Sequence, residues 1–512
     1  MSITFPCLTI PDCIEHHVQE DPDALCFSYL QKGKWHRISR SQFWDAVEWH
    51  SHRFASAFPP GELVIFIKRL DLDALAAYIG AMKAGVLPSM LSPATPKLSS
   101  DEYRRKVEHV FKLTKAGGIF VDADAAFVPE GVACLTPESS VVASLRASHA
   151  PIPQALVQFS SGSTGLQKGV VLTHEGVIAH MEDYSAAIAL SADDLIVSWL
   201  PLYHDMGLIA CFLMPLMCGV PVMLMDPFDW LLKPDLLLET IENERATICY
   251  LPNFAYHVLA KKGKVRDLSS VRLFVNCSEP VREVTHRTFL DKFPSARPEA
   301  LAVCYALAEN TFAVSQTPLN MPPTSRFIED KMVPSCGQVM PRTEIRILEP
   351  NAAGVGEIAL RGPYLFSHYL GRDLPLEQGF YRTGDLGWLD DDGGLFVTGR
   401  KKDLIITSGK NIYPQDVEHV CSIQPGVYPG RAVAFGVTNE TAGSEDLIVV
   451  VERDGTIEDL PLKLSVQKAI EGEVGIVPKR VEVVDHMRLV KTSSGKISRS
   501  RNKELFLQGG FK

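Results

Sequence analysis

Several features that mark particular classes of protein are missing from this sequence. Its 11 cysteines include no CxxC pair and have no regular spacing. In a chain of this length, that pattern predicts reduced thiols and a cytoplasmic protein, not a disulfide framework. The net charge is −10 and basic runs are short. Arg104–Lys106, for example, suits a solvated helix face, so no nucleic-acid partner is expected. The first residues lack a basic start and a long apolar core, and they indicate no signal peptide.

Long apolar runs are also scarce, and the one exception is interrupted. Residues 208–225 carry no charge and are numerous enough to span a membrane. Two prolines and a glycine fall inside this stretch, and Pro221 would break a continuous helix. We therefore predict a buried helix that ends near Cys218, a Gly-Val-Pro turn and a buried strand over Val222–Met225. No membrane span is expected.

The sequence does contain a regular alternation of short β-type runs and amphipathic helices. The runs include Leu63–Ile67, Gly118–Val121, Ala155–Gln158, Val222–Met225 and Val271–Val275, and the helices include Leu72–Ala84 and Glu175–Ala189. Buried strands that alternate with helices predict an α/β fold with layered, largely parallel sheets and flanking helices. Because 512 residues exceed what one core can hold, at least two domains are expected.

The pattern changes towards the C-terminus. After about Pro318, shorter strands separated by turns, such as Glu344–Leu348, predict a β-rich subdomain. After Gly399, strands over Arg431–Val437 and Leu447–Glu452 and a helix around Leu462–Glu473 predict a small α+β domain. The predicted boundaries are residues 1–401 for the large N-terminal domain and 402–512 for the small C-terminal domain.

The first of three candidate motifs is Ser160–Gly169, which follows a predicted strand and is rich in serine, threonine and glycine. Its backbone N–H and hydroxyl groups can bind an anion, and Lys168 adds a positive charge. It is not a Walker loop, because the lysine does not directly follow the second glycine. The same composition also suits a plain surface loop.

The other two motifs lie far along the chain. Tyr381–Gly387 is followed by Gly399–Asp403. A carboxylate such as Asp385 can accept both hydroxyl hydrogens of a ribose, although a glycine-cornered hairpin fits the same residues. The third motif, Lys491–Lys496, lies close to the C-terminal end. Lysines on such a loop are usually solvated, so this motif alone is weak.

In this order, the three motifs resemble the adenylate-forming superfamily of acyl-CoA synthetases, peptide-synthetase adenylation domains and luciferases. The resemblance covers nearly the whole chain. Within the superfamily the sequence is most similar to fatty acyl-AMP ligases. The stretches that carry this likeness are Leu200–Leu208, Pro252–Tyr256, Ser278–Arg282 and Tyr413–Asp416.

The resemblance implies a site for ATP and Mg²⁺. The residues that would hold the β- and γ-phosphates are Ser160, Ser161, Gly162, Ser163, Thr164, Gly165 and Lys168. Those that would contact the rest of the nucleotide are Ser278, Glu279, Pro280, Tyr305, Ala308, Asp385 and Arg400. Tyr305 would stack on the adenine, and Asp385 and Arg400 would bind the ribose. Glu309 would hold the Mg²⁺ ion.

The resemblance also implies an acid site and a mobile C-terminal domain. Lys496 would touch both the substrate carboxylate and the α-phosphate, and His204 would lie at the mouth of the acyl site. The other acid-site candidates are Asp205, Trp230, Phe254 and Ala306. Trp230 and Phe254 suit an ordinary aromatic core equally well. The small domain would swing about Lys402 and admit a pantetheine thiol near Gly409.

The implied function is activation of a carboxylic acid, fatty or related, to acyl-AMP with release of pyrophosphate. Transfer to the phosphopantetheine thiol of an acyl carrier protein would follow. An acyl-CoA synthetase that transfers to CoA is the alternative within catalysis. A catalytically inactive adenylate-binding protein is the alternative of another class, and a luciferase-like oxygenase is a third.

Three departures from the family pattern affect the choice of substrate and acceptor. Ala306 and Cys277 stand where the superfamily has glycine. Because an added side chain narrows the site, we expect a short, medium or unusually shaped acid in preference to a long straight chain. Gln316–Pro334 is too short for an insertion that fatty acyl-AMP ligases usually carry. That insertion is associated with refusal of CoA, so the acceptor stays open.

Overall fold

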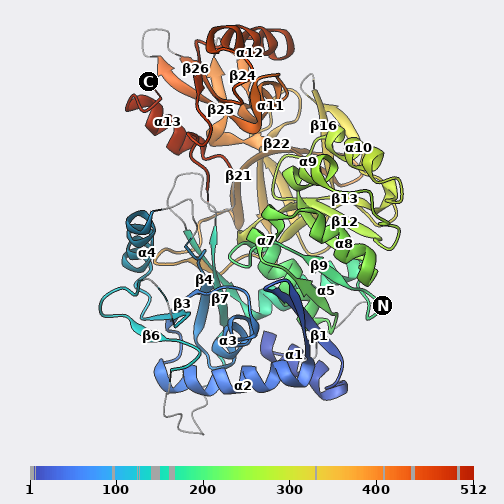
Figure 1. Ribbon diagram of the computed structural model, residues 1–512, viewed down its shortest axis with the longest axis vertical. Coiled ribbons are helices and arrows are strands. Elements are labelled where there is room, and N and C mark those ends of the chain that lie inside the picture. The colour runs from blue at the N-terminus through green and yellow to red at the C-terminus, as the bar shows by residue number, and fades with distance from the viewer. Residues whose placement is uncertain are drawn as a thin grey trace.

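The computed structural model describes residues 5, 7–94, 99–123, 125, 127–139, 150–160, 168–328, 331–407, 410–439, 444–492 and 496–511. Two parts are distinguished in Figure 1. The large part holds everything up to Arg400. The C-terminal part, from Ile405 onward and drawn in orange and red, lies above it. These two names are kept below.

A sheet of 15 strands runs through the described residues of the large part. In spatial order it contains β17 (Glu344–Leu348), β18 (Gly356–Arg361), β21 (Phe380–Leu389), β22 (Gly394–Arg400), β16 (Lys331–Val339), β14 (Ala313–Gln316), β13 (Leu301–Ala306), β12 (Leu273–Cys277), β11 (Ile248–Pro252), β9 (Ile196–Ser198), β10 (Val222–Leu224), β1 (Leu25–Gln31) and β2 (Lys34–Ser39). β15 (Ser325–Ile328) pairs with β16, and β20 (Leu376–Glu377) pairs with β21.

The direction of strand pairing changes at β13. From β13 through β12, β11, β9 and β10 to β1 every pair is parallel. Beyond β13, from β14 to β17, the pairs are antiparallel. Every residue of β11 and β12 is buried, as expected for parallel strands covered on both faces. Ligands of α/β sheets bind beyond the carboxyl ends of such strands, where β13 delivers Tyr305.

Two smaller sheets and the helices complete the large part. The parallel sheet contains β4 (Leu87–Met90), β3 (Leu63–Ile67), β5 (Gly118–Val121) and β6 (Ala133–Leu135). The antiparallel sheet contains β19 (His368–Tyr369), β8 (Lys168–Thr173) and β7 (Gln154–Ser160). The helices are α1 (Ile10–Glu20), α2 (Arg40–Ala57), α3 (Leu72–Lys83), α4 (Ser100–Thr114), α5 (His174–Ala187), α7 (Pro227–Leu232), α8 (Asp235–Glu244), α9 (Asn253–Lys262) and α10 (Glu283–Lys292), with the short 3₁₀ turns η2 (Pro298–Ala300) and η3 (Ala308–Asn310). Figure 1 shows α8, α9 and α10 lying beside β12 and β13.

The C-terminal part has its own sheets and core. The 3₁₀ turn η4 (Lys401–Asp403) leads into it, and its elements are β23 (Ile405–Thr407), β24 (Lys410–Ile412), α11 (Pro414–Ser422), β25 (Val427–Asn439), β26 (Ser444–Arg453), α12 (Asp459–Val474), β27 (Arg480–Val484) and α13 (Arg499–Leu507). Val417, Val449 and Leu462 are buried together between the β25–β26–β27 sheet and its helices. The predicted α/β class, with a β-rich region and a C-terminal α+β part, is confirmed.

The uncharged stretch is a buried helix, but its first half is wider than predicted. Met206–Leu213 forms a π-helix, η1, and Met214–Met217 continues it as α6. Cys218 ends the helix, and Gly219 then adopts a φ of 66°, which favours glycine. π-helical turns are rare and occur often at functional sites. No helix of the described residues is both long and apolar enough to cross a membrane.

Candidate active site

Asp385 is the centre of a buried hydrogen-bonded group on the large sheet. Strand pairing sets Asp385 of β21 opposite Arg400 of β22, and Arg400 Nε lies 2.9 Å from Asp385 Oδ1. The hydroxyl of Tyr305, from β13, donates to Asp385 Oδ2 at 2.6 Å. Only 4% of Asp385 is exposed. The structure thus brings together three residues that the sequence assigned to one nucleotide.

Electrostatics keep Tyr305 and Arg400 protonated at neutral pH. Burial and the charge of Asp385 raise the pKa of Tyr305 well above its ordinary value of 10. The same carboxylate raises the pKa of Arg400. Tyr305 therefore remains a hydrogen-bond donor and Arg400 a cation. A carboxylate offers about four acceptor sites, so Asp385 can accept further hydroxyl groups besides these two partners.

Glu309 lies on η3, which follows β13, and is held by Tyr369, whose hydroxyl also contacts that of Tyr381. Tyr369 donates its hydroxyl hydrogen to Glu309 Oε1 at 2.8 Å, and the hydroxyls of Tyr369 and Tyr381 are 2.9 Å apart. The Nζ of Lys168 lies 4.7 Å from the centre of the Tyr369 ring. Tyr369 therefore contacts the Glu309 carboxylate through its hydroxyl and the Lys168 ammonium group through its ring.

The backbone next to Glu309 is strained. Thr311 has φ 63° and ψ −58°, and the N–H of Phe312 donates to the carbonyl of Asn310 at 2.6 Å, which makes a γ-turn. A β-branched residue in this conformation costs about 1–3 kcal/mol. The hydroxyl of Thr311 donates to the carbonyl of Tyr364 at 2.8 Å and holds the turn.

The ends of the predicted phosphate loop lie on two paired strands. Ser160 ends β7, Lys168 begins β8, and the two are direct partners in the ladder. Ser161, Gly162, Ser163, Thr164 and Gly165 lie outside the described residues. β8 also pairs with β19, which carries Tyr369. The loop therefore starts and ends beside Tyr369, whose hydroxyl binds Glu309.

The acid-site candidates His204 and Asp205 are the last residues before η1, and Lys496 reaches them from the C-terminal part. Burial, together with the positive charges of Lys496 and Lys106, lowers the pKa of His204 to about 3. Burial raises the pKa of Asp205, and the charge of Lys496 opposes that rise. Lys496 is thus within electrostatic reach of both residues. His204 is neutral at pH 7, and its Nε2 has no hydrogen-bond partner among the described residues.

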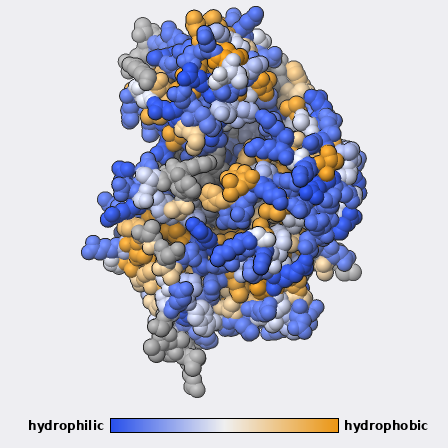
Figure 2. Space-filling view, in the orientation of Figure 1, coloured by the Kyte–Doolittle hydropathy of each residue, from blue (hydrophilic) through white to orange (hydrophobic). Residues whose placement is uncertain are grey.

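A short loop presents Lys496. The N–H of Thr492 donates to the carbonyl of Lys496 at 2.7 Å, and the N–H of Ser498 donates to that of Val490 at 3.0 Å. These bonds close the chain on itself on either side of residues 493–495, which lie outside the described residues. Figure 2 shows the surface hollowed below the C-terminal part, in the region where the two parts meet.

The aromatic candidates separate into a buried and a half-buried residue. The rings of Trp199 and Trp230 stack with centroids 3.8 Å apart and planes 5° apart, and Phe254 packs edge-on against both. Trp230 has no exposed surface, which matches the core alternative, whereas Phe254 and Ala306 are half-buried. Trp230 therefore lies in the core and supports Phe254 from its buried side.

In the segment around Ser278, the side chain of Glu279 bonds to the protein backbone. Ser278 adopts a φ of 72°, in the left-handed region that glycine favours. Glu279 Oε2 accepts a hydrogen bond from the N–H of Phe254 at 2.9 Å and so anchors the start of α9. Cys277 has no exposed surface. Its side chain therefore does not narrow an open site, contrary to our expectation, and Ala306 alone carries that argument.

Two residues near the site were missed in the sequence. Tyr369 had no motif around it. Lys106 was placed on a solvated helix face, but its charge acts on His204, and burial lowers the pKa of Lys106. A signal existed, because Tyr103 and Val110 lie three and four residues away and are both buried in α4. Lys106 borders that buried face.

Around Lys402, side-chain partners change from one part of the molecule to the other. Lys401 Nζ lies 3.0 Å from Glu357 of the large part. Asp403 accepts from Arg499 of the C-terminal part at 2.7 Å. Lys402, between them, has no salt bridge or hydrogen bond among the described residues, and its pKa is lowered by burial and by the charge of Arg400. Lys402 therefore lies where the side-chain contacts change from the large part to the C-terminal part.

One carboxylate is available for a metal ion. Among the residues that the structure describes, no group of three or more histidine, cysteine, aspartate or glutamate side chains is placed to hold a cation. A divalent ion beside Glu309 would therefore take its other ligands from phosphate oxygens and water. Mg²⁺ is bound in that way in many nucleotide sites, so the donor chemistry of Glu309 fits the predicted ion.

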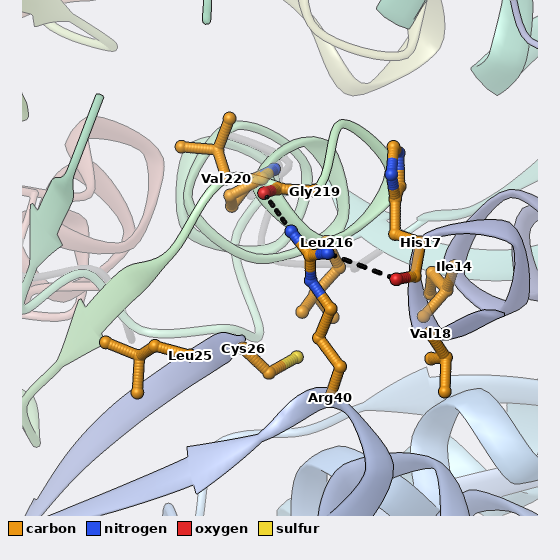
Figure 3. Close-up of a pocket in the computed structure, with 10 residues that line it drawn as sticks. Ile14, His17, Val18, Leu25, Cys26, Arg40, Leu216, Gly219 and Val220 are labelled. Atoms are coloured by element: carbon orange, nitrogen blue, oxygen red, sulfur yellow. Dashed lines mark hydrogen bonds between the residues drawn. The ribbon is translucent and has the colours of Figure 1, made fainter. Parts of the chain in front are cut away.

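Two further hollows lie outside this group of residues. An apolar cavity of about 690 Å³, counted with its open mouth, is bordered by Tyr203, Leu202, Met90 and Phe228 among others. A smaller crevice lies between α1, β1 and the turn after α6 (Figure 3). There the guanidinium of Arg40 points between two helix ends and donates to the carbonyls of His17 and Gly219 at 3.1 and 2.8 Å. This crevice is a packing feature, because its one cation is used by helix termini.

Comparison with known proteins gives one consistent result. The profile of the family described as AMP-binding enzyme matches residues 14–370. The chain is 33% identical over 405 residues to the medium-chain-fatty-acid–[acyl-carrier-protein] ligase JamA of Moorena producens, covering 69% of this chain and 68% of that protein. It is 28% identical over 600 aligned residues to the long-chain-fatty-acid–AMP ligase FadD26 of Mycobacterium tuberculosis, covering 98% of each.

Solved structures agree with these relatives. A structure from work on fatty acyl-adenylate ligases of E. coli and L. pneumophila matches with a TM-score of 0.87 and 25% identity over 99% of each chain. McyG A-PCP complexed with phenylalanyl-adenylate matches with a TM-score of 0.85 and 22% identity, covering 98% of this chain and 83% of that one. At 22% identity the second match shows the fold alone.

Proposed function

The chain belongs to the AMP-binding enzyme family, as its motifs predicted, and on that premise we propose that it is a ligase that converts a carboxylic acid to acyl-AMP and then passes the acyl group to a thiol. The observation that carries the proposal is the reach of Lys496 to His204 and Asp205. On the large part, tyrosine hydroxyls hold the carboxylates of Asp385 and Glu309 by hydrogen bonds.

In the first half-reaction a carboxylate oxygen of the acid attacks the α-phosphorus of ATP. The bond from that phosphorus to the bridging oxygen breaks, and pyrophosphate leaves. Negative charge grows on the phosphate oxygens, and Lys496 stabilises it at the acid end. His204 is neutral, so it does not repel the Lys496 ammonium group as an imidazolium would. Lys496 can therefore pair with the negative charge of the substrates. Asp385 orients the ribose through hydrogen bonds, which supports in-line attack.

In the second half-reaction a thiol sulfur attacks the acyl carbon. The bond from that carbon to the phosphate oxygen breaks, AMP leaves, and the thiol proton passes to solvent. While Lys496 occupies the acid end, a thiol cannot enter there. We infer that the C-terminal part and the residues leading into it, together the predicted domain 402–512, pivot at Lys402 between the two steps. The change of side-chain partners between Lys401 and Asp403 supports that pivot.

We propose that ATP and Mg²⁺ bind as the sequence implied. Lys168 and the loop from Ser160 would hold the β- and γ-phosphates, and Glu309 would hold the ion. When bound, the ion neutralises phosphate charge. Tyr369 keeps Glu309 in place, because its hydroxyl donates to the carboxylate.

The acid is proposed to be of short or medium length. Ala306 narrows the entrance, and the buried Trp199–Trp230 stack limits depth behind Phe254. The mostly apolar lining of the cavity beside Tyr203, the residue next to His204, suits an acyl chain. Phe228→Trp in that cavity is expected to move the preference towards shorter acids.

The acceptor is proposed to be the phosphopantetheine of an acyl carrier protein. JamA is named for such a carrier, and FadD26 is named for formation of the AMP adduct. CoA shares the pantetheine thiol and is the alternative, since residues 316–334 hold a short β15–β16 pair instead of a long insertion. A cytoplasmic location and the absence of a nucleic-acid partner stay predictions.

The test is ATP–pyrophosphate exchange over straight-chain acids from acetate to palmitate. We expect the fastest exchange with acids near octanoate. Acyl-AMP would then be offered to phosphopantetheinylated carrier and to CoA, and product formed with each would be measured. No exchange with any acid would overturn the proposal and favour an inactive adenylate-binding protein. Fastest exchange with palmitate would overturn the chain-length proposal alone.

A further inference from the structure

The first turn of α11 docks on the large part. Arg282, just before α10, uses Nη2 to donate to the carbonyl of Gln415 at 2.8 Å and to Asp416 Oδ1 at 3.1 Å. The side-chain amide of Gln415 donates to the carbonyl of Thr398 at 2.6 Å. A side chain at Gly399 would collide with Tyr413 and Gln415, so glycine permits this close approach. The start of α11 is therefore bonded to two separate places on the large part, one just before α10 and one on β22.

The same helix is connected to the loop that carries Lys496. Glu418, in the middle of α11, binds Arg499 through both of its oxygens, at 2.8 and 2.7 Å. Arg499 also donates to Asp403 at 2.7 Å. Arg499 begins α13, three residues after Lys496. α11, the chain beyond the pivot and the lysine loop therefore move as one body, and a contact on α11 sets the position of Lys496.

We propose that Arg282 is a positioning residue for acyl-AMP formation, which holds Lys496 at the acid end by clamping the first turn of α11. This inference rests on the proposed function. It names a residue that stabilises the arrangement of the C-terminal part needed for the first half-reaction. Arg282 stands on the large part, whereas both of its polar partners belong to α11. When the C-terminal part pivots at Lys402, these bonds break. A contact present in one arrangement alone shifts the balance towards it.

The strength of the clamp follows from its surroundings. The side chains of Arg282 and Asp416 are 28% and 31% exposed, so water and salt weaken their attraction. Burial and the charge of Arg282 lower the pKa of His419 on α11 to about 4. At neutral pH His419 is therefore uncharged, and it does not repel Arg282 from Asp416. A contact this exposed is modest in strength, as release between the two half-reactions requires.

The experiment separates the two half-reactions of the full-length enzyme. Arg282→Gln and Asp416→Asn would each be assayed for ATP–pyrophosphate exchange with octanoate. Transfer from purified octanoyl-AMP to pantetheine would be assayed in parallel. We expect kcat for exchange to fall about tenfold with KM for octanoate unchanged, within the usual range of such couplings. Thiol transfer stays the same or becomes faster, because the competing arrangement is weakened.

Matched variants exclude a merely structural effect. Arg287 is an exposed arginine on α10, and Arg287→Gln is expected to leave both assays unchanged. The reversed pair, Arg282→Glu with Asp416→Arg, is expected to recover part of the exchange that either single reversal loses. An equal fall in both half-reactions, or no fall in exchange, would refute the role of Arg282. Absence of exchange in the unmodified enzyme would instead refute the proposed function.

Discussion

The two halves of the candidate site are held in different ways. Asp385 and Tyr305 project from strands of one continuous sheet, and each already has its hydrogen-bond partner. Lys496 comes on a short loop from a part with its own sheet and core, and α11 connects that loop to the large part. Groups that bind the nucleotide in both half-reactions can be fixed, whereas a group needed in one step has to be removable. The fold thus supports each half in the way that its proposed role requires.

The largest expected effect comes from removing the movable half. Lys496→Ala should lower the rate of acyl-AMP formation by about 10²–10³, because one stabilising contact to developing charge is worth about 3–4 kcal/mol. Transfer from purified octanoyl-AMP to pantetheine should remain close to normal. ATP–pyrophosphate exchange and thioester formation measure the two steps. Lys479, exposed in the same part, provides the control Lys479→Ala, and an equal loss there would refute the assignment.

Damage to the fixed half is expected to affect both steps. Asp385→Asn removes the charge that pairs with Arg400 and leaves one acceptor oxygen where Arg400 and Tyr305 now use two. Hydrogen bonds to charged groups are worth about 1.5–3 kcal/mol, so kcat/KM for ATP should fall about 10- to 150-fold. Transfer from octanoyl-AMP should fall as well, since the proposed mechanism has the same carboxylate hold AMP. Full retention of thiol transfer would show that Asp385 acts in the first step alone.

A smaller effect is expected where the movable half is braced internally. Arg499→Met leaves Glu418 and Asp403 without their cation. Both acids are partly exposed, so we expect a loss of about 1–2 kcal/mol in the stability of the C-terminal part alone. Hydrogen–deuterium exchange should become faster in α11 and α13 and stay unchanged in β11 and β12. Glu418→Gln in the same chain should restore part of the protection, because it removes one unpaired charge.

Prediction from the sequence was most successful for the fixed half. Leu63–Ile67 and Gly118–Val121 form strands with the predicted bounds, because apolar runs bounded by turns leave few alternatives. The resemblance assigned Asp385 and Arg400 to one ribose, and the strand register places them opposite each other. Motifs and local pattern are sufficient where strand pairing does the positioning.

Contacts between distant segments could not be predicted in that way. The π-helix at Met206–Leu213 depends on how its start packs against the preceding loop, where Gly207 passes close to the carbonyl of Pro201. Tyr369 reaches Glu309 through pairing of β19 with β8, strands almost 200 residues apart in the chain. The clamp of Arg282 on α11 joins residues 134 positions apart. No local pattern records such partnerships.

The smallest expected effect concerns acid sensitivity of the large part. His180 is buried in α5, and its Nε2–H donates to the carbonyl of Ala313 at 2.9 Å. Burial lowers the pKa of His180 to about 4, with the charges of Asp183 and Arg342 acting in opposite directions. Between pH 6.5 and 4 the unfolded chain therefore binds more protons at this residue than the folded one. The free energy of unfolding decreases as pH falls through that window, by up to about 1.4 kcal/mol per pH unit.

His180→Gln keeps a side-chain N–H and removes the titration. Urea unfolding followed by tryptophan fluorescence at pH 7, 6 and 5 should show a shallower loss of stability in the variant, with similar stability at pH 7. Trp199 and Trp230 lie in the large core, so this signal reports on the part that contains His180. His16, half-exposed on α1, provides the control His16→Gln, for which the pH dependence should match that of the unmodified chain. Identical slopes in all three proteins would mean that His180 takes up no proton in this window on unfolding.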